Sequence, residues 1–180
     1  MLTGKLVRLR AVEPTDFESI WRWSHDPEVV HWMSSGYPES FVQAQERLAA
    51  APRNSYENCR FIIEPLHDQR AVGFVRLRDA KPEVGNAELD IQLGEKDVWG
   101  RGYATEAMRL MCRYGFNEMR LHRITLDVVA DNTAARRVYE KVGFVEEGRV
   151  RECFRRDGKW HDMILMGLLE GELRDYDSDK

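Results

Sequence analysis

The stretch that decides the fold is Trp99-Gly100-Arg101-Gly102-Tyr103-Ala104-Thr105-Glu106-Ala107. It lies where a strand-like pattern gives way to a helical one. The first turn of a helix exposes unpaired N–H groups and the positive end of the helix dipole. Gly100 and Gly102 have no side chain to keep an anion from those donors, and Thr105 adds a hydroxyl donor. The stretch therefore suits a pyrophosphate, although the glycines have the alternative role of shaping a tight turn. It matches neither the P-loop nor the full dinucleotide fingerprint.

Working outward from this turn, hydrophobic periodicity predicts strands and helices on both sides. We expect strands at residues 5–12, 60–65, 71–78, 87–93, 124–130, 146–155 and 160–169. We expect helices opened by Thr15, Asp26 and Ser40, a helix from about Ala104 to Met119, and one from Asn132 to Gly143. The order gives antiparallel hairpins at both ends and a strand–helix–strand–helix–strand unit between them. It indicates an α/β domain with a mixed sheet.

The helix after the glycines has two distinct faces. One face carries small and apolar residues and the other carries polar residues. The first set is Ala104, Ala107, Met108, Met111 and Gly115, and the second is Glu106, Arg109, Arg113 and Asn117.

Length, charge and composition exclude several classes. The 180 residues suit one domain, expected at 1–173 with a polar tail at 174–180. A net charge of −4 argues against a nucleic-acid surface. No apolar run approaches the roughly 20 residues that span a bilayer, and the start lacks a signal-peptide core. Three separated cysteines and five scattered histidines predict no metal site. We therefore expect a cytoplasmic protein that binds no membrane.

A second informative stretch runs from Asp131 to Phe144. At helical spacing Asn132, Ala135, Arg136 and Tyr139 fall near one side of a helix. Asn132 presents an amide at the start of the helix, and Tyr139 presents a phenol two turns later.

Together the two stretches resemble the GNAT superfamily of N-acetyltransferases, and specifically its RimJ/RimL branch of ribosomal-protein N-terminal acetyltransferases. That branch has an aromatic-Gly-Lys/Arg-Gly-Tyr-Ala-Thr-Glu-Ala turn, then Asn-x-x-Ser and Tyr-Glu-Lys-x-Gly-Phe. The segments 6–27 and 156–162 also resemble it, so the similarity extends over nearly the whole chain. One departure is Ala135, which stands where the branch usually has serine.

The resemblance implies a mostly antiparallel seven-stranded sheet with a splayed central strand pair that holds acetyl-CoA. Backbone N–H groups of the glycine turn would bind the pyrophosphate, and the strand ending at Ile91, Gln92 and Leu93 would pair with the pantetheine arm. Asn132 would contact the cofactor, cap its helix, or do both. The implied turn residues are Gly100, Arg101, Gly102, Tyr103, Ala104 and Thr105.

The resemblance also implies catalytic roles. Tyr139 would protonate the leaving thiolate, or else only pack its ring. Glu88 and Asp90 lie two apart on one strand and face the same side. Either would accept the proton of the amine, with Glu88 preferred because relatives carry a carboxylate near it, unless both are simply solvated acids. Trp32 and Tyr37 would line the acceptor cleft.

The expected activity is acetyl transfer from acetyl-CoA to a primary amine by direct attack on the thioester. The acceptor would be a protein N-terminal α-amine or a small amine such as a polyamine or an amino sugar. We expect no metal and, as is usual for the branch, a homodimer. The alternative is a CoA-binding sensor or partner-binding module that has lost catalysis.

Overall fold

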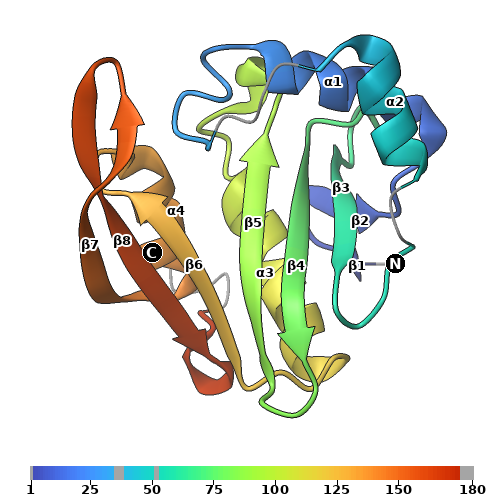
Figure 1. The fold of residues 1–180 in the computed structure, drawn as a ribbon. Helices are drawn as coiled ribbons and strands as arrows, with labels where there is room; N and C mark the ends of the chain where they lie inside the picture. Colours follow the sequence, from blue (N-terminus) through green and yellow to red (C-terminus); the bar gives the residue numbers. More distant parts are fainter. Residues whose placement is uncertain (1, 35–38, 51–52, 175–180) are drawn as a thin grey trace.

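The computed structural model describes residues 2–34, 39–50 and 53–174, which form one mixed sheet flanked by helices (Figure 1). The sheet has eight strands in the order β1-β2-β3-β4-β5-β6-β8-β7. The predicted α/β class is confirmed, and the count is eight rather than seven because the short β1 pairs with β2. The strands are β1 (Leu2–Thr3), β2 (Val7–Arg10), β3 (Cys59–Pro65), β4 (Gly73–Lys81), β5 (Asn86–Leu93), β6 (Arg123–Val129), β7 (Val145–Arg156) and β8 (Lys159–Leu169).

Four α-helices accompany the sheet in the described part of the chain. They are α1 (Phe17–His25), α2 (Phe41–Ala49), α3 (Tyr103–Asn117) and α4 (Thr133–Val142). In Figure 1, α3 and α4 lie behind the sheet, and α1 and α2 lie at its upper end. The remaining helical segments are short 3-10 turns at Pro14–Asp16, Lys96–Val98 and Glu170–Glu172. No helix among the described residues has the length and apolar content needed to cross a bilayer.

The central strands β5 and β6 form the only parallel pair among the described strands, joined by the crossover through α3. Their pairing extends only from Asn86 to Glu88 on β5 and from Arg123 to Thr125 on β6. Beyond it the strands diverge, as Figure 1 shows. The predicted splay is therefore present. Within the described ranges it leaves the facing edges of Leu89–Leu93 and of the end of β6 without a partner strand.

Alternation along the strands separates an apolar face from a charged one. On β4, Val75 and Leu77 are buried, whereas Arg76 and Arg78 are half-buried on the opposite face. Helix α3 covers the apolar face, where a side chain at Gly115 would meet Leu77 and Ile124. The charged face is thus turned away from α3.

The face of α3 that the sequence marks as polar is also buried. Glu106 and Arg109 are each 2% exposed. The Glu106 carboxylate accepts N–H bonds from Lys5 at 2.8 Å and from Leu6 and Val7 at 2.6 Å. The interpretation of this face as the polar face of an amphipathic helix was wrong for Glu106 and Arg109. Residues 5–7 cover Glu106, and Arg109 lies beside α4, where it donates to Lys141 O at 3.2 Å.

Two further local predictions have different outcomes. The helix expected after Asp26 is absent: residues 27–32 form turns, although the Asp26 carboxylate accepts the N–H of Glu28 at 2.9 Å. The hairpin turn at Asp157-Gly158 is confirmed, with φ of 50° and 75°, as a two-residue turn with two left-handed positions requires. At the carboxyl end, Arg174 donates its N–H to Val142 O at 2.9 Å. The rest of the expected tail, 175–180, lies outside the described residues.

Candidate active site

A cleft of about 800 Å³ occupies the opening between β5 and β6. Its walls come from β4, β5, β6, α4, the glycine turn and the segment before residue 35. It brings together residues far apart in the chain that the sequence predicts to be functional: Trp32, Asp90, Ile91, Gln92, Leu93, Gly100, Ala104, Asn132 and Tyr139.

Other predicted site residues do not line this cleft: Glu88, Arg101, Gly102, Tyr103 and Thr105. Tyr103 and Thr105 are 7% and 8% exposed, so their side chains belong to the interior. The hydroxyl donor expected at Thr105 stays a prediction, and the side chain of Thr105 does not line the cleft among the described residues. Tyr37 lies outside the described residues.

The glycine turn, residues 100–105, has the backbone shape expected of an anion site. Gly100 and Gly102 have φ of 75° and 83°, in the left-handed region that glycine adopts without strain. The Glu106 N–H bonds to Gly102 O at 3.1 Å. The three preceding amides, from Tyr103 to Thr105, therefore have no acceptor within the helix. A Cβ at Gly100 would have nothing within 4 Å, so this side of the turn is open.

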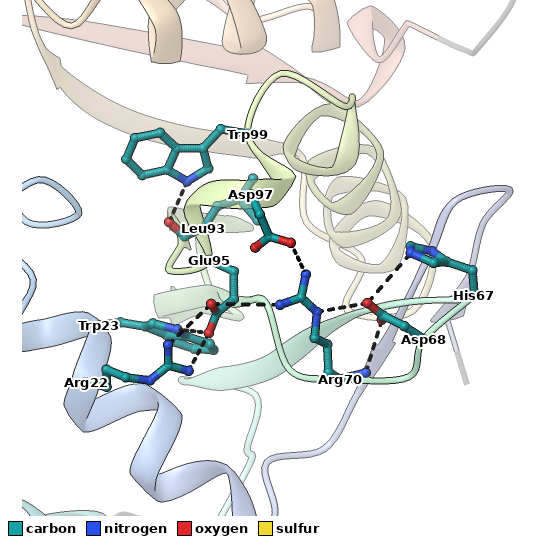
Figure 2. A network of polar contacts seen from close by, with 9 residues as sticks. All are labelled: Arg22, Trp23, His67, Asp68, Arg70, Leu93, Glu95, Asp97 and Trp99. Carbon is teal, nitrogen blue, oxygen red and sulfur yellow. Dashed lines mark hydrogen bonds and ion pairs between the residues drawn. The ribbon is translucent and has the colours of Figure 1, made fainter.

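A polar network fixes the loop that leads into the glycine turn (Figure 2). The Trp99 indole N–H donates to Leu93 O at 3.1 Å, which ties the turn to the end of β5. Glu95 accepts bonds from Trp23 Nε1 at 2.8 Å and from Arg22 at 2.6 Å, both on α1. Although burial acts in the opposite direction, these bonds lower the pKa of Glu95. The approach to the turn is therefore held from two sides before any ligand binds.

Asn132 begins α4 and lines the cleft at the same time. Its side-chain oxygen accepts the N–H of Ala135 at 3.2 Å, which is an N-cap. The capping alternative is thus confirmed. Because the cap uses only the oxygen, the amide N–H₂ group is still a possible donor toward the cleft.

Three carboxylates gather where β5 and β6 part, and we call Glu88, Asp90 and Asp127 the acidic centre. Asp90 accepts bonds from Arg76 Nε at 2.9 Å and Arg78 Nε at 3.0 Å. Asp127 lines the cleft from β6. The sequence analysis missed it, yet an acid within the otherwise β-branched run of β6 was a usable signal, because aspartate is rare in strands.

Glu88 differs from Asp90 in its electrostatics. Burial raises the pKa of Glu88, Arg78 opposes the rise, and repulsion from Asp127 and Asp90 adds to it. A hydrogen bond between the carboxyl groups of Glu88 and Asp127 acts in the same direction. A carboxyl group with a raised pKa is a better proton acceptor near neutral pH. Asp90, by contrast, is engaged by two guanidinium groups.

Tyr139 reaches the cleft from α4. Burial, followed by the charges of Asp90 and Asp127, raises the pKa of Tyr139 to about 12. Its phenol is therefore protonated at neutral pH and lies close to the acidic centre. Its ring also packs 6.2 Å from Phe144, so packing and exposure to the cleft coexist.

Trp32 lines the cleft and lies against the β7–β8 hairpin. Its ring meets His161 edge-on at 5.4 Å and lies 6.4 Å from Phe154. Beside it, Arg156 donates to Met33 O at 2.8 Å. The segment before residue 35 therefore joins the two diverging halves of the molecule across one end of the cleft.

The cleft fits a CoA thioester. The glycine turn offers N–H donors for a diphosphate, and the unpaired edge of β5 offers backbone groups to an extended amide chain. The Gln92 side-chain nitrogen is buried without an acceptor in the described part of the protein, although Gln92 lines the cleft. Amide carbonyl groups of a pantetheine arm would satisfy such a donor.

Comparison with known proteins gives a consistent result. A family model described as "Acetyltransferase (GNAT) domain" matches residues 7–145. The chain is 31% identical to the probable N-acetyltransferase YjcK of Bacillus subtilis, over 94% of this chain and 97% of that one. It is 26% identical to the putative ribosomal N-acetyltransferase YdaF of the same organism, over 92% of each. Among solved structures it resembles spermidine N-acetyltransferase from Vibrio cholerae in complex with CoA and spermine, with a TM-score of 0.81, 26% identity, and coverage of 92% of this chain and 96% of that one.

Proposed function

Because the chain belongs to the GNAT family of acetyltransferases, and is therefore an acyltransferase, we propose that it transfers the acetyl group of acetyl-CoA to a primary amine by direct attack. The observation that carries this proposal is the continuous path from the glycine turn, along the free edge of β5, to the acidic centre. A diphosphate bound at the turn and an arm lying along the strand would bring the thioester beside Glu88, Asp127 and Tyr139.

The bound thioester supplies the acyl group and a thiol leaving group. The N–H groups of the glycine turn bind the diphosphate, where the helix dipole favours negative charge. The backbone N–H groups on the free edge of β5 orient the arm and face the carbonyl oxygen, on which negative charge grows during attack. The backbone thus does the positioning.

The acidic centre handles the proton of the amine. An alkyl amine is mostly protonated at neutral pH and must lose a proton before it can attack. Carboxylates attract the ammonium ion. The ionised pair of Glu88 and Asp127 then takes one proton from the amine, and the two carboxyl groups share this proton in their hydrogen bond; the raised pKa of Glu88 favours this protonated state. Asp90 stays engaged by Arg76 and Arg78 and contributes charge rather than basicity.

Tyr139 interacts with the sulfur atom of the leaving thiolate. The nitrogen loses two protons in all: one leaves through Glu88, and the sulfur gains one. A phenol with a pKa of about 12 is a weaker acid than an ordinary thiol, whose pKa is about 8.5. Its hydroxyl would therefore first stabilise the departing thiolate by hydrogen bonding. An acceptor cation against Asp90 and Asp127 would remove their effect on Tyr139, lower the pKa of Tyr139 and ease proton transfer.

The acceptor we favour is an unhindered primary amine, either a protein N-terminal α-amine, as in the RimJ/RimL branch, or a small molecule such as a polyamine or an amino sugar. Trp32 and Tyr37 would contact it. We expect the enzyme to act in the cytoplasm. We also expect it to be a homodimer, and sedimentation of the purified protein would test this oligomeric state.

The deciding experiment measures thiol release from acetyl-CoA with peptides, polyamines and aminoglycosides as acceptors. Calorimetry with CoA accompanies it. Release with at least one amine, together with CoA binding, is the expected result. CoA binding without release for any amine would favour a sensor, and no CoA binding at millimolar ligand would refute the proposal.

A further inference from the structure

The charged face of the sheet carries two groups of opposite sign. The acidic centre lies at the parting of β5 and β6. Toward the other side, Arg60 on β3 stands opposite Arg76 on β4, and Arg76 stands opposite Asp90 on β5. We call Arg60 and Arg76 the basic edge. Neighbouring strands lie about 4.8 Å apart. Arg76 is therefore one strand away from Asp90 of the acidic centre, and Arg60 is two strands away.

Arg60 has an unusual environment for an arginine. Its guanidinium lies 5.0 Å from the centre of the ring of Phe74, which lines the cleft, whereas Arg60 itself is not among the residues that line it. Across the parts of the chain that the structure describes, no carboxylate is within ion-pair distance of Arg60. The nearby Asp90 is engaged by Arg76 and Arg78. Burial lowers the pKa of Arg60, and the charges of Arg76 and Arg47 lower it further.

This arrangement has an energetic cost that an anion would remove. A half-buried cation beside a like charge disfavours the folded state, unless an opposite charge approaches it. A planar carboxylate matches the two-pronged geometry of a guanidinium. A phosphate dianion matches less well, because it would bring a second negative charge beside Asp90.

We propose that the acceptor is an amine that also bears a carboxylate, which Arg60 binds beside Arg76 while the ammonium group meets the acidic centre. The inference rests on the proposed function, whose acceptor class it narrows. From the strand spacing, the two charges of the acceptor are about 5–10 Å apart. An α-amino acid is too short for this, so the acceptor is an ω-amino acid or a peptide-like amine with a remote carboxylate. A polyamine would place a second cation against the basic edge.

The test compares three acceptors of equal length: ε-aminocaproate, hexylamine and hexamethylenediamine. The wild-type enzyme is expected to have the highest kcat/KM with ε-aminocaproate. Arg60→Gln should lower that value about 10–100-fold, the range that a charge-assisted hydrogen bond supplies. It should leave the value for hexylamine unchanged. Lys81→Gln, which removes an exposed charge at the far end of β4, is the matched control and should change neither.

A binding measurement separates this inference from the proposed function. Caproate, which has the carboxylate and no amine, should bind to the protein in the presence of CoA and bind at least tenfold more weakly to Arg60→Gln. Retained binding by Arg60→Gln, or a preference for hexamethylenediamine, would overturn the carboxylate site even if amines are acetylated. Caproate binding without acetylation of any amine would instead leave the site standing and refute the activity. Matching thermal unfolding of Arg60→Gln and wild type shows that the variant is folded.

Discussion

The two sides of the cleft are built differently. The cofactor side is a local turn whose donors are backbone amides, shaped by two glycines and tied to α1 through Glu95 and to β5 through Trp99. The proposed acceptor side consists of side chains from neighbouring strands: Asp90 and Asp127 line the cleft, and Arg60 lies two strands from Asp90. A backbone site accepts most sequence changes that preserve its shape, whereas a side-chain site changes selectivity with one substitution. We therefore expect the acceptor side to determine the specificity of the enzyme.

The largest expected effect on activity comes from Tyr139, because proton transfer to the leaving sulfur requires both the cofactor side and the acceptor side of the cleft. Tyr139→Phe should lower kcat by about 10²–10⁴-fold, the usual contribution of a general acid, with little change in KM for acetyl-CoA. Steady-state kinetics by thiol release would measure it. Tyr114→Phe, on α3 against Phe61, is the control and should have wild-type kinetics. An unchanged kcat in Tyr139→Phe would remove this residue from the mechanism.

The next largest effect is expected from the two carboxyl groups that we propose take the proton of the amine. Glu88→Gln and Asp127→Asn should each lower kcat/KM about 10–100-fold at neutral pH, with effects that do not add because the two carboxyls act as a pair. Since the pKa of Glu88 is raised, the wild-type rate should climb with pH through a limb above the ordinary glutamate value of about 4.3, and Glu88→Gln should lose that limb. A pH–rate profile identical to wild type in Glu88→Gln would contradict the assignment.

The cofactor side has a closely matched pair of glycines. Gly100 and Gly158 both have φ of 75°, and a Cβ at either would meet nothing within 4 Å. Replacement by alanine should destabilise both variants equally, by about 1 kcal/mol, because both force a side chain into the left-handed region. Only Gly100→Ala should also raise KM for acetyl-CoA, about tenfold, because only Gly100 lines the cleft. Equal kinetics in the two variants would mean that the glycines only shape turns.

The smallest effect concerns the support of the turn. Glu95→Gln should reduce the free energy of unfolding by about 1 kcal/mol or less at pH 7. Since the folded-state pKa of Glu95 is lowered, its contribution is present above its unfolded pKa and is lost as pH falls through the folded value. Urea unfolding between pH 7 and 3 should therefore show the variant and wild type converging toward acid. A constant difference would mean that the charge of Glu95 contributes nothing.

The contrast between the two sides also explains what the sequence could predict. The strand expected at residues 87–93 is Asn86–Leu93, and the glycine turn lies between this strand and a helix as expected, because both features follow from local pattern. The positions of the acidic side chains do not follow from local pattern. Asp127 was missed because its importance depends on Glu88 across the splay, nearly 40 positions earlier in the chain.

Non-local packing also explains the incorrect predictions. Glu106 has the sequence position of a solvent-facing helix residue, and only its bonds to Lys5, Leu6 and Val7 make it internal. Residues 27–32 have a good helix start at Asp26-Pro27, yet the segment turns to place Trp32 against Phe154 and His161. Tertiary contacts outweighed local propensity in both places.

The Glu106 contact has a consequence for how the enzyme is made. The N–H groups that donate to the Glu106 carboxylate lie 99 to 101 positions earlier in the sequence. Glu106 itself is in the first turn of α3, directly after the glycine turn. During synthesis residues 5–7 cannot form these bonds until more than half of the chain has been made. Removing residues 5–7 would leave the buried Glu106 carboxylate without these hydrogen bonds, next to the glycine turn. The amino terminus, though distant from the chemistry, is thus a poor site for truncation.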